Sequence, residues 1–496
     1  MQFISTRGSS PAVSASEAIL NGLAPDGGLY VPEYIPSVDR AFVESLCPLT
    51  YAERAAKVLS LYLSDYTHSE LLEYARAAYS RFETPDTAAP TVRLTHNTYV
   101  LELYHGPTCA FKDMALTILP HLLTAAMRKN GISDKVMILV ATSGDTGKAA
   151  LAGFADVPGT AITVFYPEDG VSAVQKLQMI TQSGENVSVF AVKGNFDDAQ
   201  NGVKRIFSDR ACAERLAARG IRLSSANSIN WGRLVPQIVY YISAYCDLLN
   251  QNAIAYGDTV DICVPTGNFG NILAAFYAKK MGVPLGRLIC ASNENNVLTE
   301  FLQTGRYDRL RDFKKTSSPS MDILISSNVE RLLAELSGHN GSEVAGMMSA
   351  LVNEGSYTVS EELLRSIREL FAAGNTDDAG TYEAIRATYK TGWLSDTHTA
   401  VALKVLEDYR ARTGEERITV VASTASPFKF AIDVNAALEG SEVRPDLDGG
   451  TEILDTLSAK TGVSIPEPLS GLDSREKRFK VSVEPADMLS AMEGAF

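Results

Sequence analysis

Short apolar runs, rich in β-branched residues and separated by stretches of helical length, constrain the fold of this 496-residue chain most strongly. Apolar and polar residues do not alternate within these runs, which is typical of strands buried on both faces. The runs lie at residues 136–141, 161–166, 187–192, 260–264, 288–291 and 418–422. Helical patterns separate them at 175–182, 199–208, 234–248 and 271–281. A strand followed by a helix, repeated along the chain, predicts an α/β protein with parallel sheets.

The first eighty or so residues follow a different pattern. Residues 51–63 and 68–82 have helical patterns, and the polar, proline-bearing stretch 83–90 indicates a linker or domain edge. We therefore expect a mainly helical region at 1–90 that precedes the α/β part of the chain. Farther along the chain, an amphipathic helix is expected at 360–371, followed by a loop at 372–380.

Composition excludes several classes of protein. The formal charge of −14 argues against nucleic acid or an anionic membrane as the main partner, because such binding needs clustered basic surface. No apolar run approaches the roughly 18 residues of a membrane span, and the start lacks a signal-peptide pattern, so a cytoplasmic protein is expected. The six cysteines form no Cys-x-x-Cys pair and the histidines show no ligand spacing, so we expect no metal site.

The segment Pro265-Thr-Gly-Asn-Phe-Gly-Asn271 lies between an expected strand and an expected helix. Its two glycines let the backbone turn tightly and let an anion come close, while the N–H groups and dipole of the helix point toward that anion. The segment is neither the dinucleotide fingerprint nor a P-loop. It predicts a phosphate cradle, with a plain Gly-Asn turn as the alternative.

Two loops rich in hydroxyl groups also follow expected strands. They are Ala141-Thr-Ser-Gly-Asp-Thr-Gly147 and Val421-Ala-Ser-Thr-Ala-Ser-Pro-Phe-Lys429. Both lie at the carboxyl ends of strands, where open α/β sheets bind ligands. A Walker motif is excluded at Lys148, because Thr142 stands where the first glycine belongs and Ala149 replaces the magnesium-binding hydroxyl. The alternative for each loop is a plain cap or turn.

Lys112 lies in the apolar segment His105-Gly-Pro-Thr-Cys-Ala-Phe-Lys-Asp113 and is the only lysine or arginine between Arg93 and Arg128. Desolvation disfavours the charge of such a lysine, and a neutral amine is the form that attacks an aldehyde. Taken alone, such a residue is more often a surface lysine whose stem packs on apolar neighbours. Combined with a phosphate cradle and a hydroxyl-rich loop, it supplies the parts of a pyridoxal 5′-phosphate site.

A second candidate anion site is Asn227-Ser-Ile-Asn-Trp-Gly-Arg233, just before an expected helix. The arginine fork suits a phosphate, and the Asn and Ser side chains can donate further hydrogen bonds. Such a site would imply a phosphorylated substrate distinct from the cofactor. The alternative is a capped helix with a surface arginine.

Together these motifs resemble the threonine synthases, in the longer form of that family within the fold type II pyridoxal-phosphate enzymes. The resemblance runs from Ser5-Thr-Arg-Gly8 to Ser423-Thr-Ala425. Between these ends it is carried by residues 22–32, 105–113, 142–147, 227–233, 265–271, 292–295, 326–331 and 396–401. It implies two open parallel-sheet domains of the tryptophan synthase β-like kind, with an N-terminal mainly helical region at 1–90. The large, cofactor-binding domain would comprise residues 91–130 and 241–496, and the small α/β domain at 131–240 would be inserted into it.

The resemblance also implies a reaction, in which O-phospho-L-homoserine and water become L-threonine and phosphate. Lys112 would be the catalytic residue and would hold pyridoxal 5′-phosphate as a Schiff base. The other cofactor-binding residues would be Gly267, Asn268, Phe269, Gly270 and Asn271 at the phosphate, Thr424 at the pyridine nitrogen and Asp145 near the 3-hydroxyl. The substrate would be held by Thr142, Ser143, Thr146, Asn227, Ser228 and Arg233, the last three chiefly at its phosphate.

The sequence departs from the family pattern at a few positions. Ser426 stands where the family usually has a histidine, Phe428 where it has an alanine, and Lys148 also where alanine is usual. These differences bear on substrate geometry more than on the cofactor. His398 lies in a family motif, and both a structural and a catalytic role are open for it.

Two other functions are compatible with parts of this pattern. Another fold type II enzyme, such as a serine or threonine dehydratase, would share Lys112 and the glycine cradle but would not need Asn227, Ser228 and Arg233. A non-catalytic threonine-synthase-like protein would bind the cofactor or a phosphorylated metabolite, and the intact catalytic positions weigh against it. The sequence does not distinguish a monomer from a homodimer.

Overall fold

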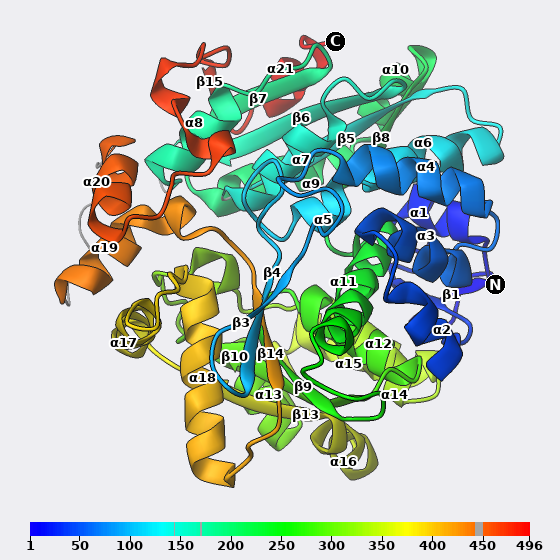
Figure 1. Ribbon diagram of the computed structural model, residues 1–496. Helices are drawn as coiled ribbons and strands as arrows, with labels where there is room; N and C mark the ends of the chain where they lie inside the picture. Colours follow the sequence, from blue (N-terminus) through cyan, green and yellow to red (C-terminus); the bar gives the residue numbers. More distant parts are fainter. Residues whose placement is uncertain (143, 169–170, 442–449) are drawn as a thin grey trace.

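Two β-sheets organise the molecule (Figure 1). The computed structural model describes residues 1–142, 144–168, 171–441 and 450–496. The larger sheet has six strands in the order β13-β10-β9-β14-β4-β3, and the smaller has five in the order β15-β7-β6-β5-β8. Two-stranded sheets β1-β2 and β11-β12 complete the set among the described residues. The strand and helix alternation of the sequence thus produces the α/β architecture expected from it.

The larger sheet is parallel except at one edge, where β3 runs antiparallel to β4. Its strands are β3 (Thr91–Arg93), β4 (Thr98–Glu102), β9 (Val260–Pro265), β10 (Leu285–Ser292), β13 (Phe371–Asn375) and β14 (Thr419–Ser423). Every residue of β4, β9 and β14 is buried, because helices or neighbouring segments cover both faces of the sheet. The unalternating apolar runs are explained by this double burial.

The smaller sheet is parallel throughout. Its strands are β5 (Lys135–Ala141), β6 (Thr160–Pro167), β7 (Val187–Val192), β8 (Ile221–Ser224) and β15 (Ser482–Val483). Strand β15 comes from the far end of the chain and pairs with β7, an addition that the sequence patterns did not indicate. The domain boundaries expected from the sequence stay a prediction.

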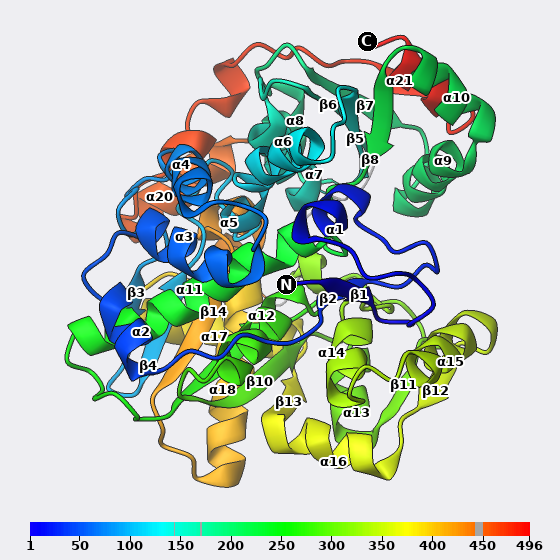
Figure 2. The same ribbon diagram turned by 90° about the vertical axis from the view of Figure 1, so that its right-hand side faces the viewer.

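The N-terminal region contains β1 (Phe3–Ser5), α1 (Ala15–Asn21), β2 (Tyr30–Pro32), α2 (Arg40–Leu46), α3 (Tyr51–Tyr62) and α4 (His68–Tyr79). Helices α1, α3 and α4 each begin at a capping box, in which a Ser or Thr hydroxyl and a Glu carboxylate satisfy opposite backbone N–H groups. Figure 2 shows this region against the centre of the molecule.

The N-terminal motif is anchored far along the chain. Thr6 Oγ1 donates to Glu330 Oε1 at 2.6 Å, and the Arg7 guanidinium binds the same carboxylate at 3.0 Å. Glu330 lies in α14 (Val329–Leu336) and is buried. The N-terminal segment is therefore part of the folded core and not an appendage.

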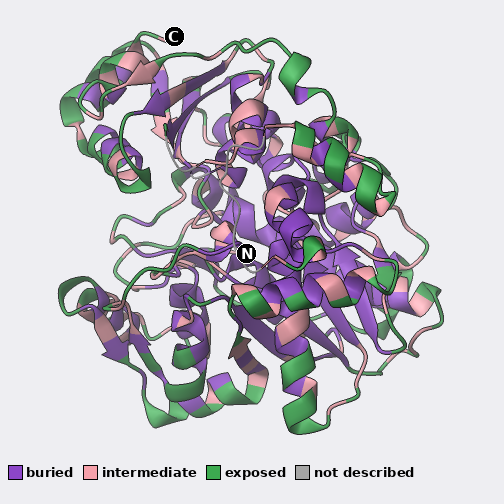
Figure 3. Ribbon diagram, turned by 90° about the vertical axis from the view of Figure 1, so that its left-hand side faces the viewer, coloured by how far each residue is buried: buried purple, intermediate pink, exposed green. Residues whose placement is uncertain are grey.

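The remaining helices surround the two sheets. They are α5 (Asp113–Leu116), α6 (Leu119–Lys129), α7 (Asp145–Phe154), α8 (Ala173–Ile180), α9 (Phe196–Ser208), α10 (Arg210–Ala218), α11 (Trp231–Asn250), α12 (Gly270–Lys280), α13 (Val297–Thr304), α15 (Gly341–Asn353), α16 (Glu361–Leu370), α17 (Asp378–Tyr389), α18 (Thr397–Thr413), α19 (Ala431–Glu439), α20 (Glu452–Thr461) and α21 (Met488–Glu493). The short strands β11 (Arg306–Asp308) and β12 (Ser356–Thr358) lie beyond the larger sheet. Figure 3 shows buried strands at the centre and exposed residues on the outer helices. No helix in the described part of the chain is long and apolar enough to cross a membrane.

One sequence expectation was wrong. Residues 372–380 were expected to form a loop, but Phe371–Asn375 is strand β13 and α17 begins at Asp378. The strand forms because β10 offers a parallel partner, with Ala372 opposite Ile289 and Ala373 opposite Cys290. Its small residues have little strand propensity of their own, so the pairing comes from tertiary context.

Candidate active site

Lys112 lies immediately before α5, which Figures 1 and 2 place between the two sheets. Its side chain is 11% exposed, and its Nζ lies 3.5 Å from Asp145 Oδ2 and 4.8 Å from the ring centre of Phe111. Burial lowers the pKa of Lys112, and the attraction of Asp145 opposes this only in part. Burial therefore disfavours the charged form of Lys112, as its apolar sequence context led us to expect.

Asp145, at the first turn of α7, is the most heavily bonded group in the site. Its Oδ1 receives Lys429 Nζ at 2.7 Å and Gln175 Nε2 at 2.9 Å, while its Oδ2 receives Ser320 Oγ at 3.3 Å and faces Lys112. Burial would raise the pKa of Asp145, but the Lys429 and Lys112 ammonium groups hold it well below its usual range. Asp145 is therefore a fixed carboxylate.

The loop that carries Lys112 is hydrogen-bonded to the end of β14. Phe111 N donates to Thr424 O at 2.8 Å, and Ser426 N donates to Cys109 O at 3.0 Å. These bonds place Thr424, which is 6% exposed, beside the lysine loop, and its role at the cofactor stays a prediction. Ser426, at the position where the family usually has histidine, uses its side chain to cap the short helix that follows.

The predicted phosphate cradle does join strand β9 to the N-terminus of α12. Phe269 caps this helix with a left-handed backbone, at a φ of 61°. A Cβ on Gly267 would come within 2.7 Å of the Ser320 carbonyl oxygen, so only glycine fits there. The first N–H groups of a helix have no partner inside it, which leaves those of α12 directed at the turn.

Asn271 and Asn328 connect the cradle to neighbouring elements. Asn271 Oδ1 lies 2.6 Å from the Tyr240 hydroxyl of α11, while its buried Nδ2 has no partner among the described residues. Asn328 Nδ2 lies 3.0 Å from Asn268 O and 3.3 Å from Ser228 O. Asn328 thus joins the cradle to the Asn227–Arg233 motif, so the two predicted phosphate-binding segments are neighbours in the fold.

Arg233 lies in the first turn of α11 and is only 3% exposed. Its Nη1 donates to Ala226 O at 2.5 Å and its buried Nε has no partner, and it forms no ion pair within the described part of the chain. Burial lowers the pKa of Arg233 to about 10. A buried guanidinium without a carboxylate is unusual, because an unpaired charge is costly to bury. The arrangement suits an anionic ligand.

The other predicted substrate residues differ in their burial and in their hydrogen bonds. Thr142 is buried, and its Oγ1 accepts hydrogen bonds from Gly144 N at 3.0 Å and Gly147 N at 2.9 Å, so it shapes the loop. Thr146 and Ser228 are half-buried and Asn227 is exposed. The prediction for Ser143 lies outside the described residues. The substrate contacts assigned to all of these residues stay predictions.

His398 is buried and contributes to the site through its neighbours. Its Nδ1 lies 3.1 Å from Asp396 Oδ1, and its Nε2 accepts the backbone N–H of Ser320 at 3.1 Å. Since Nε2 accepts, the proton lies on Nδ1 and the ring is neutral. In this arrangement His398 holds Ser320, whose hydroxyl then reaches Asp145.

Several residues of the site were not singled out from the sequence, among them Lys429, Ser320 and Asn328. Lys429 had a signal, because it lies in the apolar run Ser426-Pro-Phe-Lys-Phe430, much as Lys112 lies in its own. Ser320 had none, since it follows the polar segment 314–318 like any loop residue. Asn328 is in a matched motif, but only the fold shows that its amide bridges two distant turns.

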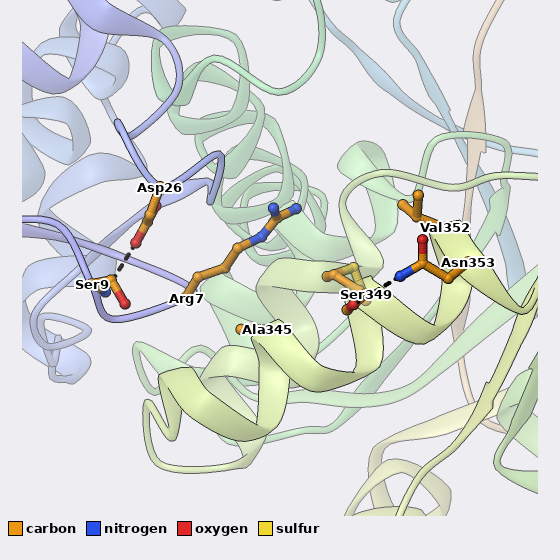
Figure 4. Close-up of a pocket in the computed structure, with 8 residues that line it drawn as sticks. Arg7, Ser9, Asp26, Ala345, Ser349, Val352 and Asn353 are labelled. Atoms are coloured by element: carbon orange, nitrogen blue, oxygen red, sulfur yellow. Dashed lines mark hydrogen bonds between the residues drawn. The ribbon is translucent and has the colours of Figure 1, made fainter.

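Figure 4 shows a surface hollow with a different set of lining residues. It is lined by Arg7, Ser9, Asp26, Ala345, Met348, Ser349, Val352 and Asn353. It contains none of the predicted site residues, and its Arg7 is already paired with Glu330. The hollow therefore has no part in the predicted site, and the assignment of the chemistry to Lys112 stays a prediction.

Comparison with known proteins identifies a family that matches this chain. The family model for the threonine synthase N terminus matches residues 2–79, and that for the threonine synthase C-terminal part matches residues 399–492. Threonine synthase of Pseudomonas aeruginosa is 39% identical over 443 residues, covering 88% of this chain and 90% of the relative. Human threonine synthase-like 1 is 40% identical over 505 residues, covering 98% of this chain and 67% of the relative.

Two solved structures agree along the whole chain. The PLP-bound threonine synthase from Brucella melitensis superposes with a TM-score of 0.88 at 36% identity, covering 100% of this chain and 99% of the other. Threonine synthase from yeast gives a TM-score of 0.89 at 33% identity, covering 99% and 97%. The fold class expected from the sequence is confirmed.

Proposed function

The chain belongs to the threonine synthase family, and from that membership we propose that it is a pyridoxal-phosphate-dependent lyase. Its reaction converts O-phospho-L-homoserine and water into L-threonine and phosphate, the last step of threonine biosynthesis. The family relationship supports the reaction, and the arrangement around Lys112 supports the assignment of residues.

The residues present suit pyridoxal 5′-phosphate. The cofactor carries an aldehyde, a phosphate and a pyridine ring, and the site offers a separate partner for each. Lys112 is a buried amine with a lowered pKa, and Gly267 leaves room where any side chain would clash. Asn271 has an unpartnered buried Nδ2 at the same turn. The cradle at Gly267–Asn271 would hold the phosphate, with Thr424 near the ring nitrogen and Asp145 near the 3-hydroxyl.

When bound at Lys112, the cofactor would act as an electron sink for the negative charge left on a substrate carbon when a proton is removed from it. The protein's own residues then orient the substrate and move protons. Arg233, with Asn227 and Ser228, would bind the substrate phosphate and hold the leaving group in place. The Lys112 Nζ is the proton acceptor and donor at the substrate carbons, because its environment favours the neutral form.

The observation that carries this assignment is the buried, unpaired guanidinium of Arg233 beside Asn227 and Ser228. An enzyme acting on serine or threonine has no second phosphate to bind and no need for that charge. Purified protein loaded with pyridoxal phosphate should release phosphate and L-threonine in equal amounts from O-phospho-L-homoserine. A Lys112→Ala variant is the control and should release neither.

Other products would point to other functions. Pyruvate or oxobutyrate formed from serine or threonine, without phosphate release, would indicate a dehydratase. Cofactor and substrate binding without any turnover would indicate the non-catalytic alternative. We also propose a cytoplasmic location, supported by the six cysteines, all of which are free thiols.

A further inference from the structure

A second lysine lies in the site and has no part in the reaction proposed above. Lys429 is in the short 3₁₀ helix Pro427–Phe430 that follows β14, and its side chain is 0% exposed. Its ammonium donates to Asp145 Oδ1 at 2.7 Å and to Thr108 O at 3.0 Å. A fully buried lysine is rare without a specific partner, and here both partners belong to segments that flank Lys112.

Lys429 is closer to the Asp145 carboxylate than Lys112 is. The Lys429 distance is 2.7 Å and the Lys112 distance is 3.5 Å, and they engage different oxygens of the carboxylate. Two lysine amines thus lie against one carboxylate within a buried site. Coulombic attraction grows with proximity, so the nearer lysine receives most of the stabilisation of its charged form.

We propose that Lys429 is a positioning residue of this site: it fixes the Asp145 carboxylate and, as the nearer cation, leaves Lys112 as the amine that gives up its proton. The inference rests on the proposed function, in which Lys112 is the cofactor lysine. The two lysines thus have different roles, which follow from their distances to Asp145.

The charged groups around Lys112 are consistent with this division. After burial, Asp145 raises the pKa of Lys112, and the positive charges of Lys429 and Arg233 lower it. Nearby Asp113 does not compete for Lys112, because its two oxygens accept from Thr108 N at 2.8 Å and Thr108 Oγ1 at 2.6 Å. His398 accepts the Ser320 backbone N–H and packs its ring against Phe430, with 4.6 Å between the ring centres, and it has no hydrogen bond to either lysine among the described residues.

Removal of the Lys429 charge should therefore change how readily Lys112 loses its proton. In Lys429→Met, Asp145 would lose its closest cation and would pair with Lys112 instead, and one like charge near Lys112 would disappear. Both changes favour the ammonium form of Lys112. We expect the pH at which this amine becomes reactive to rise by about one unit or more, which is the usual effect of a charge at such a distance.

The test is the pH dependence of Lys112 acetylation by acetic anhydride in the full-length chain without cofactor. Peptide mass spectrometry would quantify the label, with exposed Lys480 as the internal standard. The midpoint should rise in Lys429→Met and stay near the wild-type value in Lys429→Arg, which keeps the charge. If Lys429→Met does not fold, Lys429→Gln removes the charge while keeping a polar tip.

Lys148→Met is a matched control. Lys148 is another lysine in a buried setting, and burial lowers its pKa to about 7, but its Nζ donates to Gln182 and not to Asp145. An unchanged Lys112 midpoint in Lys429→Met, or an equal rise in Lys148→Met, would overturn the proposal. No substrate is present in this measurement, so its result is independent of whether the protein turns over O-phospho-L-homoserine.

Discussion

The unpaired charge of Arg233 allows us to predict how its removal changes the free energy of unfolding. Burial lowers the pKa of Arg233 from 12.5 to about 10, which corresponds to a cost of about 3 kcal/mol for keeping the charge in the folded protein. The sign follows from the lowered pKa, since the folded state binds this proton less tightly than the unfolded state. The full cost is present at every pH below about 10 and falls as the pH rises through that value.

We expect Arg233→Met to be more stable than the wild type when no phosphate is bound. The variant removes the cost of about 3 kcal/mol and one hydrogen bond to Ala226 O, which is worth about 1 kcal/mol. The expected net gain is about 2 kcal/mol. The assay is urea denaturation near neutral pH in phosphate-free buffer, with the protein saturated with pyridoxal phosphate so that the cradle at Gly267–Asn271 is filled.

Inorganic phosphate should reverse the order. At 100 times its dissociation constant, a ligand stabilises the folded protein by about 2.7 kcal/mol, and only the wild type keeps the guanidinium that would bind it. Arg54→Met is the control, because Arg54 is also buried but is paired with Asp247 at 2.6 Å. Its removal should destabilise the protein by leaving Asp247 unpaired. The reasoning is refuted if Arg233→Met is less stable than the wild type without phosphate, or if phosphate stabilises both equally.

Two further predictions concern the cradle and the lysine loop. Gly267→Ala should weaken pyridoxal-phosphate binding roughly tenfold in a fluorescence titration, because the new methyl group would lie 2.7 Å from Ser320 O. Gly346→Ala is the control and should bind the cofactor normally, because its methyl group would meet no atom within 4 Å. Burial would lower the pKa of His105, but hydrogen bonds with Glu102 and a second carboxylate raise it. His105→Asn should therefore destabilise the protein more at about pH 6 than at about pH 9 in thermal unfolding, and equal losses at both would contradict this.

The sequence predicted the strands whose burial depends on their own residues. Residues 187–192 form β7 as expected, because their apolar side chains fill both faces of the sheet. It did not predict β13, whose Ala372, Ala373 and Gly374 gain strand structure only from β10. The order of the strands and the pairing of β15 with β7 depend on contacts between residues that are far apart in the sequence. A local sequence pattern does not predict such contacts.

The sequence predicted those parts of the candidate site in which the residue type itself indicates the chemistry. A lysine in an apolar run and a glycine turn between strand and helix could be recognised in Lys112 and Gly267. The electrostatics could not, because they depend on which side chains meet. Lys429, rather than Lys112, is the close partner of Asp145, and this follows from two distances that only the folded chain defines.

The pairing of β15 with β7 has a consequence for the order in which the molecule is completed. Lys193 and Glu484, whose side chains bond beside this pair of strands, are 291 residues apart. During synthesis the edge of β7 emerges from the ribosome long before its partner does, and an unpaired edge strand is a template for aggregation. The smaller sheet thus has an open edge while the residues between β7 and β15 are synthesised, and residues 481–484 then cover it.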